Sequence, residues 1–187
     1  MEHLKIRTNV NLKYKLKKIN KPIDNVPSFY QPYMNYVPAD GNLLQHLKDI
    51  QIETEQIVFN LSEEKLDYRY DKDKWTIKDI LVHLSDCERF LVYRAMRIAR
   101  ADKTNLPGFD EKLFSLNANA HSRPISDIVK ELNVFRASSI VFLETLTEQE
   151  LNRTGTANGY LLSARLLVNQ IYGHHKHHLN IIKEKYL

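Results

Sequence analysis

Two histidines four residues apart have the clearest chemical meaning in this sequence. His174 and His178 lie in the segment 172–179, which reads YGHHKHHL. Residues four apart project from one face of a helix, so the two imidazoles would lie side by side. A buried polar group without a partner costs about 1–3 kcal/mol, and a divalent metal ion shared by both rings removes that cost. The alternative is that the clustered histidines solvate and cap the end of the last helix.

The apolar pattern of the same helix favours the metal site. Ile171 and Ile181 fall on the face that carries His174 and His178, so the pair interrupts a stripe that would otherwise be core. Zinc proteases place Glu, their general base, directly after the first histidine, and here that position is His175. The spacing therefore indicates a metal site of another kind.

A third ligand is available from His83, at the margin of the apolar stripe of an earlier helix. At a rise of about 1.5 Å per residue, His83 lies roughly 10 Å from the start of its helix, and His178 roughly 12 Å from the end of the last one. These depths match only if the two helices are antiparallel. That arrangement requires a crossover, which the long link 102–124 can supply. Cys87, one turn beyond His83, is interpreted as a small apolar filler and not as a ligand.

Four amphipathic helices are predicted to position these residues. Apolar residues recur every three or four positions from about residue 40 onward, and no segment shows the alternation typical of strands. Thr76 and Asp79 have the spacing of a helix-capping box. The pattern predicts an all-α four-helix bundle with helices at about 42–61, 76–101, 125–146 and 161–186.

Two segments precede the helices. Residues 1–21 form a basic, disordered leader with a charge of about +6, which leaves about −2 for the rest of the chain. A nearly neutral body argues against nucleic acid as a partner. The segment 22–38 carries a proline every five or six residues with tyrosines between, so we expect an extended arm without regular helix. The arm packs on its own domain or, in a homodimer, on the second subunit.

Composition limits the number of domains and the cellular compartments that fit this protein. The chain has 187 residues, 43% of them hydrophobic, which suits one globular domain. One cysteine excludes an internal disulfide, and neither a secretory signal nor a bilayer-spanning run is visible. We therefore expect a cytoplasmic protein with no membrane partner.

Taken together, these motifs resemble the DinB/YfiT-like family, whose members are regarded as metal-dependent enzymes. The resemblance extends over residues 22–187, and the segments that carry it are 75–88, 93–102, 107–111, 155–159 and 173–179. It implies a bundle wound up-down-down-up. It also implies that His83, His174 and His178 hold one divalent metal ion, nickel or zinc.

The resemblance and the open coordination position left by three histidines lead to two hypotheses. The first is an enzyme that activates water or a substrate thiol, as a hydrolase or a thiol transferase acting on a small molecule, such as a low-molecular-weight thiol. Asp86 would orient a ligand or accept a proton, and Arg94 would bind an anionic substrate group. Their alternatives are a surface carboxylate and an interhelical ion pair. The second hypothesis is a non-catalytic metal-stabilised bundle that binds a partner or dimerises.

Overall fold

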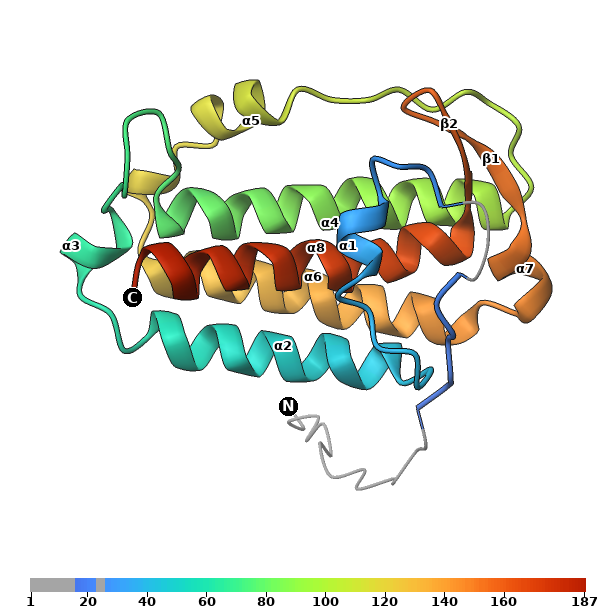
Figure 1. Cartoon of the computed structure of the whole chain (residues 1–187), viewed down its shortest axis with the longest axis horizontal. Coiled ribbons are helices and arrows are strands. Elements are labelled where there is room, and N and C mark those ends of the chain that lie inside the picture. Colours follow the sequence, from blue (N-terminus) through green and yellow to red (C-terminus); the bar gives the residue numbers. More distant parts are fainter. Residues whose placement is uncertain (1–15, 23–25) are drawn as a thin grey trace, which may run out of the picture.

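Four long helices form the body of the protein (Figure 1). The computed structural model describes residues 16–22 and 26–187. The long helices are α2 (Leu43–Val58), α4 (Ile77–Ala99), α6 (Ile125–Thr145) and α8 (Ala164–Lys185). The first three lie within two or three residues of the predicted ranges. The all-α bundle is confirmed.

The bundle winds up-down-down-up, because α2 and α8 run in one direction and α4 and α6 in the other (Figure 1). The parallel pair α4 and α6 is joined by a crossover along the length of the molecule, as predicted. This crossover contains α5 (Glu111–Asn117) and the short 3-10 helix η1 (Ala120–Ser122). Its Leu106 pairs with the backbone of residues 156 and 158, which anchors the start of the crossover. The result is an antiparallel α4–α8 pair with its interface at the centre of the bundle.

Side-chain caps define where the two central helices begin. Thr76 accepts a hydrogen bond from the Asp79 amide at 3.0 Å, and the Asp79 carboxylate accepts one from the Thr76 amide at 2.9 Å. This is the capping box predicted from the sequence. At α8, the Ser163 hydroxyl accepts from the Leu166 amide at 3.0 Å. Two further one-turn helices, α3 (Glu63–Leu66) and α7 (Glu148–Asn152), follow α2 and α6.

The predicted start of the last helix is wrong. Residues 160–163 belong to an antiparallel hairpin of β1 (Thr154–Ala157) and β2 (Tyr160–Ser163), and α8 begins only at Ala164. Asn158 and Gly159 form the turn with φ of 52° and 79°. An Asn-Gly pair suits such a two-residue hairpin turn because both positions need positive φ.

The N-terminal arm also differs from the expectation of a fully extended segment. It contains α1 (Gln31–Met34), in which Pro32 occupies the first turn, where its missing N–H costs nothing. Residues 16–21 of the predicted leader pack on the bundle: Ile19 is buried and its amide donates to the Gly41 carbonyl at 2.9 Å. Residues 1–15 of that leader lie outside the described residues.

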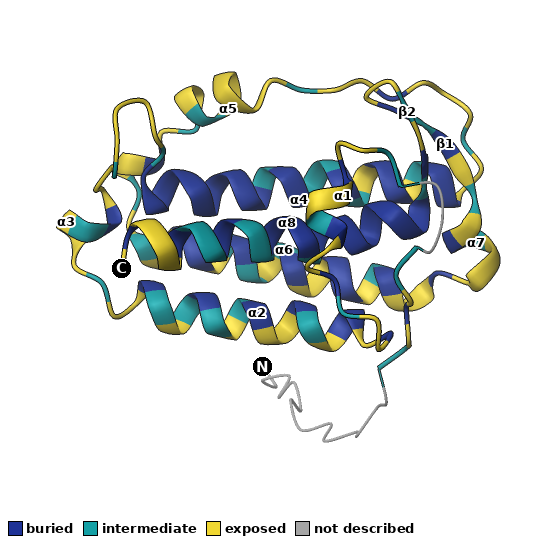
Figure 2. Cartoon of the chain, viewed as in Figure 1, coloured by how far each residue is buried: buried dark blue, intermediate teal, exposed yellow. Residues whose placement is uncertain are grey.

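The core consists of two apolar clusters, one toward each end of the bundle, with buried polar side chains between them. One cluster includes residues 91–99 of α4 and 166–171 of α8, and the other includes residues 77–84 of α4 and Ile182 of α8. Figure 2 shows that α4 and α8 are the most thoroughly buried helices. In the described part of the chain, no helix has the length and apolar character needed to cross a bilayer.

Candidate metal centre

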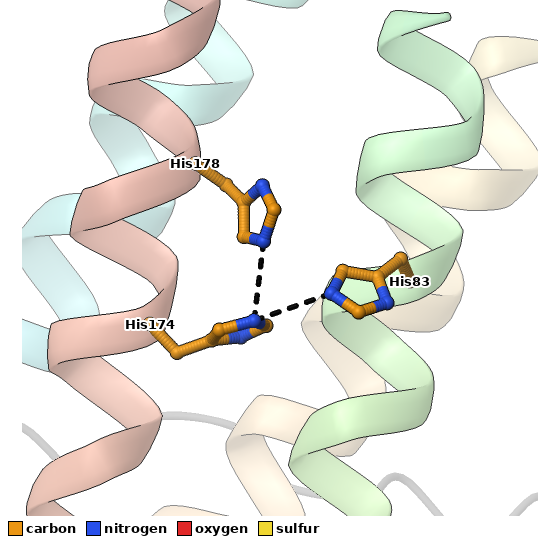
Figure 3. A group of neighbouring side chains, drawn as sticks. All are labelled: His83, His174 and His178. Atoms are coloured by element: carbon orange, nitrogen blue, oxygen red, sulfur yellow. Dashed lines mark hydrogen bonds between the residues drawn. The ribbon is translucent and has the colours of Figure 1, made fainter. Parts of the chain in front are cut away.

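Three histidines meet between α4 and α8, where the two apolar clusters leave a polar layer (Figure 3). The Nε2 atom of His174 lies 3.2 Å from Nε2 of His83 and 3.1 Å from Nε2 of His178. All three side chains are buried. One helical turn separates the two histidines of α8, and antiparallel packing of α4 brings His83 to the same depth. The structure thus brings together all three residues predicted as ligands.

Burial keeps these imidazoles neutral. It lowers the pKa of His83 to about 4. The pKa values of His174 and His178 are also well below the ordinary range, first because of burial and then because neighbouring imidazoles disfavour further positive charge. Neutral imidazole is the form that can donate a lone pair to a metal ion.

The donor set fits a divalent metal ion better than it fits a hydrogen-bonded trio. In a neutral imidazole, one ring nitrogen carries a single N–H donor and the other a single acceptor lone pair. Nε2 of His174 can therefore make only one good hydrogen bond, and not one with each of two other Nε2 atoms. Three imidazole nitrogens around a tetrahedral zinc ion would be about 3.3 Å apart, given metal–nitrogen distances of about 2.0–2.1 Å. The two separations of 3.1 and 3.2 Å are close to this value.

Aromatic rings and a thiol surround the three histidines. Trp75 packs on His83 with ring centroids 4.5 Å apart, and the edge of Tyr33 meets His174 at 5.5 Å. The Cys87 sulfur lies 3.5 Å from Nε2 of His83, and burial strongly raises the pKa of this thiol. The residues whose ligand atoms converge are His83, His174 and His178 and do not include Cys87, which agrees with the sequence-based interpretation of Cys87 as filler. The Nδ1 atom of His178 is buried without a hydrogen-bond partner in the described chain.

A second buried polar group stands behind the histidines and is not predicted from the sequence. Arg136 of α6 donates three hydrogen bonds to the Glu88 carboxylate at 2.8–3.0 Å and one to the Leu47 carbonyl at 2.8 Å. It donates a further one, at 3.1 Å, to Nδ1 of His175. Nε2 of His175 lies 2.9 Å from the Thr54 hydroxyl, which itself donates to the Ile50 carbonyl. His175 therefore carries its proton on Nε2 and accepts from Arg136 at Nδ1. His175, the residue after His174 on α8, is thus linked to side chains of all three other long helices, directly to Thr54 and Arg136 and through Arg136 to Glu88.

Comparison with known proteins identifies the family to which this bundle belongs. The model of the DinB superfamily matches residues 46–182. The chain belongs to the DinB superfamily. A relative from Oceanobacillus iheyensis, named "Putative metal-dependent hydrolase", is 25% identical over 143 residues, which are 73% of this chain and 81% of that one. A relative of the same description from Geobacillus thermodenitrificans is 28% identical over 123 residues, or 65% and 69% of the two chains.

A solved structure shares the fold of this DinB-superfamily chain. YfiT from Bacillus subtilis, described as a probable metal-dependent hydrolase with an unusual four-helix bundle topology, superposes with a TM-score of 0.71 at 19% identity. The match covers 89% of this chain and 91% of YfiT. The crossover between α4 and α6 thus belongs to a known variant of the bundle.

The other two predicted site residues of this DinB protein form no hydrogen bond to the three histidines in the described chain. Asp86 forms an ion pair with Arg89 at 3.3 Å and, among the described residues, has no hydrogen bond to a histidine of the cluster. Its role in orienting a ligand or accepting a proton stays a prediction. Arg94 has no carboxylate within ion-pair distance in the described chain, so the interhelical ion pair considered for it is not observed. It donates instead to the Pro107 carbonyl at 2.7 Å.

Two cavities flank the histidines along the α4–α8 interface. A small one, about 60 Å³, is lined by His174 together with Cys87, Arg94 and Glu111. A large one, about 730 Å³, lies toward the start of α4 and the end of α8 and is lined by His178 together with Trp75. The crossover segment contributes to both linings, because the small cavity contains Glu111 and the large one contains residues 112–121.

Proposed function

We propose that the protein is a metal-dependent hydrolase whose divalent ion, nickel or zinc, is held by His83, His174 and His178. The observation that carries this proposal is the convergence of three buried imidazoles: Nε2 of His174 lies 3.1–3.2 Å from the other two Nε2 atoms, and one ligand atom of each ring lies within 4.8 Å of the others. Imidazole suits both nickel and zinc. Three protein ligands leave a coordination position open for catalysis, whereas structural zinc sites have four. The curated relatives named as metal-dependent hydrolases support the same reaction class.

The bound ion would lower the pKa of a water molecule and polarise a substrate carbonyl. The protein's own residues would exclude water and orient the ligands. The rings of Trp75 and Tyr33 pack against the histidines and limit the access of bulk water. The ion pair of Arg136 and Glu88 fixes His175 and, through it, the rotation of α8 about its axis. This support keeps the neighbouring His174 directed at the centre.

A carboxylate is needed to accept a proton from water, and Glu111 is the best candidate. Among the residues that the structure describes, it is the one carboxylate in the lining of the small cavity, which it shares with His174. Glu111 is exposed but partly desolvated by its neighbours, which raises its pKa, and the Arg94 charge offsets part of this effect. A carboxylate positioned at the reacting water can accept its proton as a general base. Sequence reasoning misses Glu111 because it is far from the histidines in the sequence and begins a short helix.

The test measures metal content and hydrolysis together. Untagged full-length protein is analysed for metal beside His83→Ala and His178→Ala, and circular dichroism checks that each variant folds. We expect about one nickel or zinc per wild-type chain, loss of metal from both variants, and hydrolysis of a panel of esters and amides only by the loaded wild type. If the wild type stays metal-free after incubation with both ions, the hydrolase proposal fails and the alternative of a non-catalytic bundle is favoured. Transfer of a small thiol to 1-chloro-2,4-dinitrobenzene without hydrolysis would replace the hydrolase by a thiol transferase.

A further inference from the structure

The small cavity beside His174 contains polar groups of Arg94 and Gln170 whose hydrogen-bonding capacity the described residues do not fill. Its volume of about 60 Å³ is well below the roughly 300–1,000 Å³ of cavities that enclose drug-sized ligands. Only a group of a few heavy atoms can enter. Aromatic rings form much of its wall, among them Tyr30, Tyr33 and Phe90.

Arg94 brings a positive charge to this cavity. Its side chain is 5% exposed, and among the described residues only the Pro107 carbonyl accepts a hydrogen bond from it. The guanidinium carbon lies 5.6 Å from the centre of the Phe90 ring and 6.0 Å from that of Phe109, so aromatic rings hold it in place. A guanidinium has five N–H donors, and the planar fork of two of them matches a carboxylate. Arg94 therefore has donors available for an anionic group.

Gln170 brings an acceptor without a donor. It lies one helical turn before His174 on α8 and also lines the small cavity. Its side chain is 4% exposed, and its Oε1 atom has no hydrogen-bond partner in the described chain. An unpaired buried acceptor of this kind costs about 1–3 kcal/mol unless a ligand donates to it. A ligand N–H group can supply this donor.

We propose that the small cavity binds the amino-acid end of an N-acylated amino acid. Arg94 would bind its carboxylate, and the amide N–H would donate to Oε1 of Gln170. The acyl carbonyl next to that N–H would then lie on the side of His174. This inference rests on the proposed hydrolase function, since it names the substrate class of the same site. Glu111 balances part of the Arg94 charge, so the cavity favours a monoanion with an N–H group over a dianion.

The larger cavity supports this assignment by offering room for the acyl group. It lies on the other side of the three histidines, and Trp75, Ile181 and Tyr186 form part of its lining beside charged residues at its margin such as Arg69 and Asp79. A ligand with its carboxylate at Arg94 and its scissile amide at the histidines would extend its acyl chain toward this cavity. An apolar or aromatic acyl group matches the residues there.

The experiment compares three small probes by amide chemical-shift titration of the full-length protein, metal-free and zinc-loaded. N-acetylglycine has both recognised groups, N-acetylglycinamide lacks the charge, and acetoxyacetate lacks the N–H. We expect N-acetylglycine to bind wild type at least about tenfold more tightly than either other probe. Arg94→Met should weaken N-acetylglycine by at least about tenfold, and Gln170→Met should abolish the preference over acetoxyacetate. Arg97→Met, which removes a surface arginine one turn along α4, should bind within about twofold of wild type.

The outcomes separate this proposal from the proposed function. Because neither Arg94 nor Gln170 is a predicted metal ligand, binding of N-acetylglycine to the metal-free protein tests the cavity even if no metal-dependent hydrolysis is found. Equal binding of the three probes to wild type, or no saturable binding, would overturn the proposal. The probe comparison in wild type does not depend on any variant folding. Unchanged affinity in a folded Arg94→Met would also overturn it, and Arg94→Lys provides a second variant that keeps the charge but loses the planar fork.

Discussion

Arg136 of α6 and Glu88 of α4 form a two-point ion pair at the centre of the bundle, with both side chains only 2% exposed. Removing one partner of such a pair leaves an uncompensated buried charge. We therefore expect Arg136→Met to lower the free energy of unfolding by about 3–5 kcal/mol in urea titrations. The double variant Arg136→Met with Glu88→Leu should recover at least about half of this loss, because both charges are gone. Equal destabilisation of the single and double variants would show that lost packing, and not the stranded charge, is the cause.

Metal binding should appear as thermal stability. A ligand at about 100 times its dissociation constant stabilises the folded state by about 2.7 kcal/mol. For a chain of this size, that corresponds to a rise in melting temperature of about 5–10 °C. We expect zinc or nickel to produce this rise in the metal-free wild type and not in His178→Ala, measured by calorimetry. Magnesium, which prefers oxygen ligands, serves as the control and should leave both melting temperatures unchanged. The same rise in His178→Ala would place the metal elsewhere.

The buried histidines should make the metal-free protein sensitive to acid. Burial lowers the pKa of His83 from 6.5 to about 4, so between these values the unfolded chain binds a proton that the folded chain does not. The free energy of unfolding must therefore fall as the pH falls from about 6.5 to 4. His83 alone accounts for a loss of about 3 kcal/mol over this range. Urea titrations at several pH values should show a smaller loss for His83→Phe than for wild type. His121→Gln, which replaces an exposed histidine, should behave like wild type.

The main helices and the three histidines could be predicted because each leaves a local pattern. Apolar periodicity marks α2, α4 and α6, and the four-residue spacing of His174 and His178 survives in any helix. The Asn158-Gly159 turn is visible in the sequence, but strands of four residues are too short to show a period, so the second strand is predicted as helix. Arg136 looks like any polar residue of an amphipathic helix. Its burial follows only from the partners that three other helices bring to it.

Glu111 provides a direct test of the proposed mechanism. A positioned general base contributes about 10²–10⁴-fold to rate, so Glu111→Gln should lower kcat for hydrolysis of 4-nitrophenyl acetate by at least about 100-fold in the zinc-loaded protein. The metal content should be unchanged, and the fall in rate of the wild type on the acid side should disappear. The same measurement on Asp86→Asn tests the role predicted for that residue from the sequence. A reduction of less than about threefold in Glu111→Gln would exclude Glu111 as the base.

Gly173 couples the N-terminal arm to the helix that carries two of the histidines. A Cβ atom at this position would lie 2.9 Å from the carbonyl carbon of Tyr33 and closer still to its oxygen. Alanine in a helix interior is ordinarily more stable than glycine by about 1 kcal/mol. Here we expect Gly173→Ala to destabilise the protein instead, because the clash is with backbone that cannot turn away. The arm should separate from α8, expose the His174 ring that Tyr33 covers, and become a site of limited proteolysis within residues 26–38. If Gly173→Ala is as stable and as protease-resistant as wild type, the close packing of arm and helix is not maintained in solution.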